Sequence, residues 1–178
     1  MPSNFPSTGD MPSRLGKAML IAAWVVGLAL LVLFFQDVLE RRHNPNRSPA
    51  LQVDAVGIPS VVLRRNRMGH YVTVGHINGE SVTFLLDTGA TTVALPMALA
   101  RRLDLPLKPG VSTMTANGVV RTWSTRLDTV DVAGLVARNV RAVVMPNMPG
   151  DDALLGMSYL KRFELIQRGD TLTLRAPG

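Results

Sequence analysis

One short acidic motif in this sequence has the residue types needed for hydrolytic chemistry. Asp87 directly follows the apolar run 84–86, and Thr88 and Gly89 come immediately after it. A carboxylate at the end of a buried strand is costly to desolvate unless it is hydrogen-bonded or shares a proton. Gly89 lets the backbone approach a ligand or another backbone closely. The motif therefore indicates a site where an acid is held for function.

The residues around this motif predict the strands that position it. Residues 71–77 and 81–86 alternate between apolar and polar side chains, as strands with one buried face do. Asn78 and Gly79 stand between them. This dipeptide favours a type I′ turn, because both central positions of that turn need a positive φ. We expect a hairpin whose second strand leads straight into Asp87.

The remainder of the C-terminal region also has strand-like patterns separated by turn signals. Asn117 and Gly118 separate residues 111–115 from 119–127, and residues 168–170 separate 163–167 from 171–175. Residues 135–145 add a further strand. A helix is predicted over 96–103, since proline suits a first helical turn, and a second short helix follows Gly156. Many short strands with close turns predict a small all-β barrel or sandwich with a single core.

The chain contains three sequence elements whose order resembles that in the retropepsin-like aspartic peptidases (clan AA), in particular their bacterial, membrane-anchored, single-domain branch. The first is Leu-Leu-Asp-Thr-Gly-Ala-Thr over 85–91, and the second is a glycine-containing hairpin over 113–120. The third is Leu-Leu-Gly over 154–156, followed by a predicted short helix. The tripeptide Asp-Thr-Gly alone occurs by chance in many proteins, whereas the three elements together, in this order, are specific to the family. Two departures are Met157, where retroviral members often have a charged residue, and a hairpin without tyrosine.

The resemblance implies a fold and roles for particular residues. The fold is an all-β, small closed barrel-like lobe with one or two short helices. Asp87 is the catalytic carboxylate, and Thr88, Gly89 and Ala90 support its turn. The tentative flap residues, which contact substrate, are Ala116, Asn117 and Gly118, and the structural residues near the site are Leu155 and Gly156.

The resemblance also implies a mechanism that uses two carboxylates, one water and no metal or other cofactor. The chain has one such motif and length for one lobe, so the second Asp87 must come from a second copy across a twofold axis. An active peptidase of this kind is a homodimer that cleaves protein or peptide substrates. Because Ala90 cannot donate a hydrogen bond to the carboxylates, we expect a less acidic optimum than that of pepsin-like enzymes.

Length, charge and cysteine content exclude several other classes. The chain has 178 residues, a net charge of +6, no cysteine and 47% hydrophobic residues. Disulfide frameworks and Cys-based metal or redox sites are therefore excluded, and low-complexity disorder is disfavoured. The basic residues are spread along the chain without interleaved aromatics, so we expect no nucleic-acid partner.

The N-terminal region predicts a membrane anchor. Residues 18–35 carry neither charged nor strongly polar side chains, and a helix of that length spans roughly 27 Å, close to the apolar thickness of a bilayer. A cleaved signal peptide is the alternative, but no small-x-small cleavage site follows. The predicted organisation is a tail over 1–17, a transmembrane helix over 18–35, a flexible tether over 36–66 and the peptidase domain over 67–178. The basic residues leave orientation open; the resemblance implies a bacterial inner membrane with a periplasmic domain.

Three other functions are alternatives to a peptidase. A catalytically silent dimeric module on the same fold would still bind an extended peptide beneath the flap. A metal site built from His70, His76 and Glu80 lacks standard zinc spacing and an HExxH motif. A serine triad lacks the G-x-S-x-G signature.

Overall fold

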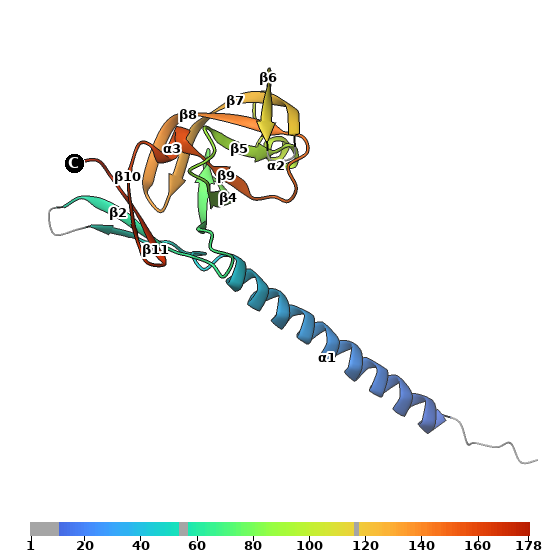
Figure 1. The fold of residues 1–178 in the computed structure, drawn as a ribbon. Coiled ribbons are helices and arrows are strands. Elements are labelled where there is room, and N and C mark those ends of the chain that lie inside the picture. Colours follow the sequence, from blue (N-terminus) through green and yellow to red (C-terminus); the bar gives the residue numbers. More distant parts are fainter. Residues whose placement is uncertain (1–10, 54–56, 116–117) are drawn as a thin grey trace, which may run out of the picture. The chain divides into compact units, whose positions relative to one another are not determined.

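The computed structural model describes residues 11–53, 57–115 and 118–178, and divides into two units, residues 1–41 and 42–178. The elements of the chain are α1 (Met11–His43), β1 (Leu51–Val53), β2 (Pro59–Arg64), β3 (Val72–Ile77), β4 (Glu80–Leu86), β5 (Val93–Pro96), α2 (Met97–Arg102), β6 (Lys108–Thr115), β7 (Gly118–Val132), β8 (Leu135–Met145), β9 (Ala153–Leu155), α3 (Met157–Leu160), β10 (Glu164–Arg168) and β11 (Thr171–Arg175). Figure 1 shows their arrangement.

The first unit consists largely of helix α1. Its residues 16–36 are all exposed, including Trp24 at 74% and Phe34 at 66%. Such a helix is apolar on every side, which is unlike a surface helix of a soluble domain. Residues 16–43 form a helix long and apolar enough to cross a membrane, although a signal sequence near the N-terminus has the same length and composition. The predicted helix over 18–35 is confirmed as a helix, and its insertion in a membrane stays a prediction.

The second unit contains a closed β-barrel. The sheet order is β3-β4-β9-β5-β8-β7-β6, and β3 also pairs with β7 through His76–Asp131 and Ile77–Val130. This last pairing closes a six-strand barrel (Figure 1). Closure leaves no free edge along the strands that surround the core. The predicted all-β, closed barrel-like fold with short helices is confirmed.

The hairpin that precedes Asp87 forms as expected. Strands β3 and β4 pair in register from Val72–Leu85 to Ile77–Glu80. Asn78 and Gly79 both have positive φ, 52° and 89°, as a type I′ turn requires. The predicted turn at residues 168–170 is also present, since it joins β10 to β11.

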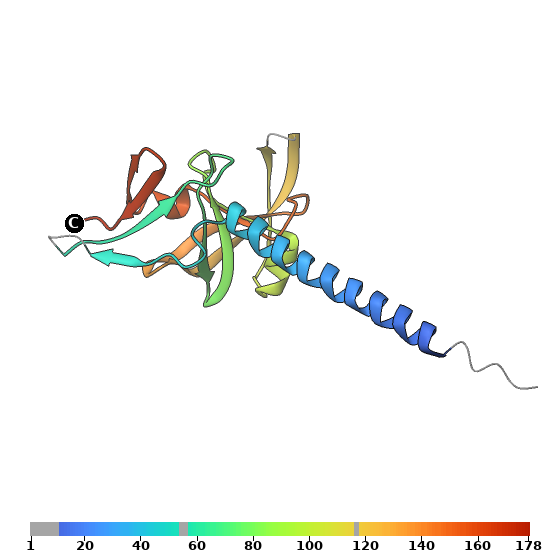
Figure 2. The same ribbon diagram turned by 90° about the horizontal axis from the view of Figure 1, so that it is seen from below.

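Strands β6 and β7 form a long hairpin that extends beyond the barrel. β7 pairs with β8 from Trp123 to Val132, whereas its first part, from Gly118, pairs with β6 alone. Figure 2 shows this hairpin standing out from the remaining strands. A hairpin that extends beyond the barrel is the expected form of a flap. The predicted flap residues Ala116 and Asn117 lie outside the described residues, and Gly118 begins β7 opposite Thr115.

The prediction of an irregular tether over residues 36–66 is wrong for most of that range. Helix α1 continues to His43, and β1 and β2 join β11 and β10 in a second sheet of order β1-β2-β11-β10. Val61 and Leu63 of β2 are fully buried. The second unit therefore starts at Arg42 rather than at residue 67. Strand β2 was not predicted because its six residues lie between polar, proline-containing segments. Its partner strand, β11, is about a hundred residues further along the chain.

Asn46 fixes the start of the second unit to the barrel. Its side-chain amide donates to Arg64 O at 2.9 Å and to Val72 O at 2.7 Å, and its Oδ1 accepts from Arg64 N at 2.7 Å. The residue is only 7% exposed. A buried side chain with three backbone partners specifies one position for the segment that carries it.

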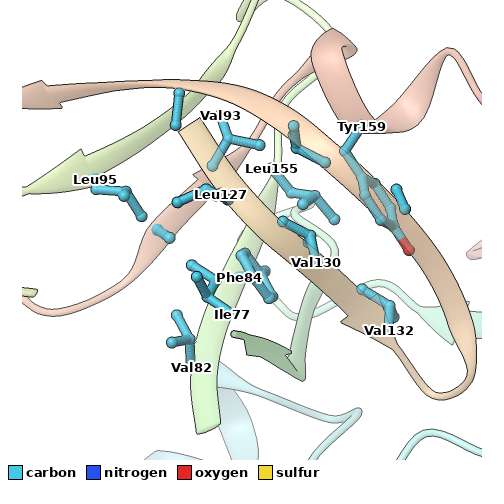
Figure 3. Packing of buried hydrophobic residues seen from close by; sticks show 14 of the residues in the cluster. Ile77, Val82, Phe84, Val93, Leu95, Leu127, Val130, Val132, Leu155 and Tyr159 are labelled. Carbon is cyan, nitrogen blue, oxygen red and sulfur yellow. The ribbon is translucent and has the colours of Figure 1, made fainter. Parts of the chain in front are cut away.

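The hydrophobic core consists mostly of aliphatic side chains, together with the aromatic rings of Phe84 and Tyr159. Phe84, Leu95, Leu127 and Leu155 are fully buried, and Figure 3 shows these side chains directed toward one another from different strands. Strand β4 alternates buried Val82 and Phe84 with partly exposed neighbours. The strand that leads to Asp87 is thus anchored by its inward-facing side chains.

Candidate active site

Asp87 is held at the end of β4 by main-chain pairing with β9. Strands β4 and β9 are parallel, with Phe84, Leu85 and Leu86 opposite Ala153, Leu154 and Leu155. The Asp87 N–H continues this ladder by donating to Leu155 O at 3.2 Å. Asp87 is half-buried. The predicted structural residue Leu155 thus supports Asp87 through its carbonyl group while its side chain fills the core.

The Asp87 turn (residues 87–91) is closed by hydrogen bonds to Asp87 itself. The Gly89 N–H donates to Asp87 Oδ1 at 2.8 Å, and the Ala90 N–H donates to Asp87 O at 3.3 Å. An aspartate that accepts from the backbone two residues on is a common turn device. The donation fixes one carboxylate oxygen and leaves Oδ2 without a hydrogen bond within the described residues. A Cβ on Gly89 would lie 3.2 Å from Oδ1, so this position favours glycine.

Thr88 and Ala90 differ in their surroundings. Thr88 is exposed, and its hydroxyl makes no hydrogen bond to the described part of this chain. Ala90 is half-buried, and its carbonyl accepts from Met157 N at 2.8 Å. The predicted role of Thr88, bracing two turns across a dimer, needs a second copy and stays a prediction.

Gly156 allows the segment behind the Asp87 turn to pack against its backbone. A Cβ built on Gly156 would lie 2.7 Å from Ala90 O and still closer to Thr92 O. The glycine has φ −88° and ψ −175°, an extended conformation open to any residue. Space, and not backbone conformation, therefore excludes a side chain here. The expectation that Gly156 permits close packing agrees with this contact.

Ser158 is a positioning residue that the sequence reasoning missed. Its hydroxyl accepts from Val93 N at 3.0 Å and donates to Arg141 O at 2.8 Å. It thereby links the start of β5, strand β8 and helix α3, and it is 5% exposed. The available signal was a serine in the otherwise hydrophobic run 157–160.

Tyr159 anchors helix α3 to the start of strand β8. Its phenol donates to Leu135 O at 2.7 Å, and its ring is fully buried (Figure 3). Burial raises the pKa of this phenol strongly, and the negative charge of Asp131 raises it further, whereas a backbone hydrogen bond from Val132 lowers it. The tyrosine therefore stays neutral and keeps α3, which follows Gly156, in position.

No group of three or more His, Cys, Asp or Glu side chains that could hold a metal ion occurs within residues 11–53, 57–115 and 118–178. His43 contacts Asp152 at 2.9 Å between Nε2 and Oδ2, and both side chains are partly exposed. The chemistry available at the Asp87 turn is accordingly that of a carboxylate and backbone amides.

Comparisons with known proteins agree with this arrangement. The family model described as gag-polyprotein putative aspartyl protease matches residues 73–162. A retropepsin-like aspartic protease from Rickettsia conorii, known as a crystal structure, superposes with a TM-score of 0.59 at 28% identity, covering 72% of this chain and 96% of that one. The chain belongs to this aspartyl protease family and has its retropepsin-like fold.

Two curated relatives are longer than the matched region. An uncharacterized protein in the cobV 5′ region of Sinorhizobium sp. is 34% identical over 135 residues, which cover 74% of this chain and 58% of that protein. The uncharacterized protein RP867 of Rickettsia prowazekii is 32% identical over 111 residues, which cover 60% of this chain and 47% of that protein. The chain thus spans about half the length of the curated relatives it matches.

Proposed function

We propose that this protein is a membrane-anchored aspartic endopeptidase in which two copies of the chain each supply Asp87 to one active site. The observation that carries the proposal is the Asp87 turn: a half-buried aspartate at the end of a barrel strand, whose carboxylate accepts one hydrogen bond from the Gly89 N–H and whose main chain pairs with Leu155. Asp128 and Asp131 lie in β7, and Asp151 and Asp152 precede β9. The sequence Asp-Thr-Gly occurs once in the printed chain, so in this proposal the second carboxylate comes from a partner copy.

In the proposed mechanism the two Asp87 carboxyl groups share one proton, because two like charges about 3 Å apart do not both ionise readily. The ionised group takes a proton from a bound water, whose oxygen attacks the carbonyl carbon of the scissile peptide bond. The protonated group donates a hydrogen bond to the carbonyl oxygen. When the C–N bond breaks, the leaving amine takes up a proton from the dyad, and no covalent intermediate with the protein is formed.

The test of catalysis is digestion of a peptide library by the full chain in detergent micelles over a range of pH. Asp87→Asn keeps the size of the side chain and removes its general base, so we expect cleavage to stop while the melting temperature is preserved. Asp128→Asn is the matched control, because Asp128 is exposed on β7 outside the turn. Peptide binding by Asp87→Asn together with no cleavage by the unmodified chain would instead support a silent binding module.

The test of the shared site is a mixing experiment. When the unmodified chain and Asp87→Asn are dissociated together in equal amounts and allowed to reassociate, random pairing leaves about half of the active chains in mixed dimers. Activity per active chain should then fall to about one half if both carboxylates are needed. Independent monomers would keep their full activity.

We further propose that residues 18–35 contact the lipid bilayer as a single-pass anchor in a bacterial inner membrane, with the barrel in the periplasm. Support comes from residues 18–35 of α1, which carry no charged side chain and are exposed. Protease added to spheroplasts should digest the barrel of an intact anchored chain, and N-terminal sequencing should recover a chain that retains α1. Loss of α1 from the mature protein would identify it as a signal sequence.

A further inference from the structure

A pocket of about 440 Å³ lies between strand β8, the base of the β6–β7 hairpin and the residue Thr92 that follows the Asp87 turn. This volume is within the range of pockets that hold small ligands or side chains. Its walls include three cationic residues, Lys108, Arg126 and Arg141, and no acidic residue. The pocket is thus positively charged and concave.

In the described part of the chain, no acidic side chain pairs with the cations of this pocket. Residues 105–127 contain no Asp or Glu, and within the described residues neither Lys108 nor Arg141 has a side-chain hydrogen bond or an ion pair. The Arg126 guanidinium donates at 2.9 Å to the neutral side chain of Asn139. The cations therefore remain available to an anion.

Two of the cations are directly opposite each other. Arg126 and Arg141 are cross-strand partners in the β7–β8 ladder, an arrangement of like charges that costs stability. A carboxylate placed between them would remove the repulsion and form charge-assisted hydrogen bonds. Thr92 and Thr125 add hydroxyl groups to the same walls.

The pocket adjoins the Asp87 turn along the chain and across the sheet. Thr92 is five residues beyond Asp87, and Val93 pairs in parallel with Ala142, which also lines the pocket. Figure 1 shows β5, β8 and β7 side by side, in the order given by their pairing. A peptide extended past the turn beneath the β6–β7 hairpin would bring its outer side chains to this pocket.

We infer that the pocket selects substrates that carry an acidic side chain, Asp or Glu, away from the cleaved bond. This inference rests on the proposed function. Since a homodimer repeats the pocket through its twofold axis, acidic residues on either side of the cleaved bond would be favoured. Lys108 and Arg141 are the specificity-determining residues, because their charged groups are not committed to other parts of the described structure.

The experiment compares peptide pairs that differ only by Glu or Gln at each position around the cleaved bond. For the full chain in detergent, we expect kcat/KM to be about fivefold or more higher for Glu at one or more positions, the effect of one partly screened ion pair. In Lys108→Gln/Arg141→Gln the ratio should fall toward one. For the unmodified chain, the Glu/Gln ratio of kcat/KM should also decrease when the salt concentration is raised from about 0.05 M to about 1 M.

Arg138→Gln/Arg168→Gln is the matched control, because it removes two exposed charges outside this pocket. It should leave the Glu/Gln ratio unchanged. An unmodified chain that cleaves both peptides with ratios within about twofold would overturn the inference and leave the proposed function intact. Equal losses in the two double variants would overturn it as well, since net charge alone would then explain the preference.

A binding measurement decides the inference even if no peptide is cleaved. Fluorescently labelled Glu and Gln peptides are titrated with full-length Asp87→Asn, with and without the Lys108→Gln/Arg141→Gln pair. Tighter binding of the Glu peptide that is lost with the pair supports the pocket, whereas equal binding of both peptides refutes it. Absence of cleavage by the unmodified chain would count separately, against the proposed function.

Discussion

Gly156→Ala should destabilise the barrel and disturb the Asp87 turn at the same time. The added Cβ would overlap Thr92 O and lie 2.7 Å from Ala90 O, well inside the about 3.5 Å at which nonbonded atoms attract. Both neighbours are backbone atoms and do not rotate away. The segments 90–92 and 156–157 must therefore separate, which also lengthens the 2.8 Å hydrogen bond from Met157 N to Ala90 O.

The expected cost follows from these two contacts. Overpacking of a tight site costs about 1–3 kcal/mol, and a weakened buried backbone hydrogen bond about 0.5–1.5 kcal/mol. Their sum, about 1.5–4.5 kcal/mol in the free energy of unfolding, corresponds to a fall in melting temperature of roughly 5–16 °C for a unit of this size. Because any residue adopts the φ and ψ of Gly156 without strain, the backbone conformation adds nothing to this cost.

The assay is thermal unfolding of the full chain, combined with hydrogen exchange of segments 84–92 and 153–160 and cleavage of the best library peptide. We expect faster exchange in both segments and a marked loss of cleavage. Gly16→Ala is the control, since a Cβ there meets nothing within 4 Å. A melting temperature lowered by less than about 2 °C with normal cleavage would refute the close approach at Gly156.

Three smaller predictions concern residues that position the site. Ser158→Ala should lower the free energy of unfolding by about 1–3 kcal/mol, measured by urea denaturation, because Val93 N and Arg141 O lose their partner. Asn46→Ala should cost at least as much in the same assay, since three backbone hydrogen bonds are removed. The pKa of Tyr159 is raised in the folded state, so its contribution to the free energy of unfolding is complete below a pH of about 10 and is lost as the pH rises above that value. Tyr159→Phe should therefore lose less stability at alkaline pH than the unmodified chain does. An unchanged slope of stability against pH would contradict the buried phenol.

Local signals in the sequence were sufficient for the hairpin and for the Asp87 turn. Asn78 and Gly79 determine a turn whose backbone conformation few other dipeptides adopt. The apolar run before Asp87 and the glycine two residues after it specify a strand followed by a tight turn. These features depend on neighbours in the chain, so a single sequence contains enough information to predict them.

Features that depend on distant partners could not be predicted in the same way. Barrel closure rests on two residue pairs between β3 and β7, and nothing in either strand specifies the other. Strand β9 has only three residues and pairs with β4 in parallel, which short apolar runs do not reveal. Ser158 was missed because its two partners, Val93 and Arg141, come from two other strands.

The corrected start of the folded unit leads to a last prediction about truncated chains. A chain of residues 42–178 should fold, whereas residues 67–178, the boundary expected from sequence, should not. The shorter chain lacks the fully buried Val61 and Leu63, each worth about 1.5–3 kcal/mol. It also lacks the β2–β11 pairing and the bonds of Asn46.

These losses together approach the 5–15 kcal/mol by which domains are typically stable. Circular dichroism should therefore show a cooperative melt for residues 42–178 and none for residues 67–178. A cooperative melt of residues 67–178 at the temperature of the longer chain would mean that β2 is an accessory strand, and the barrel alone would then be the unit that positions Asp87.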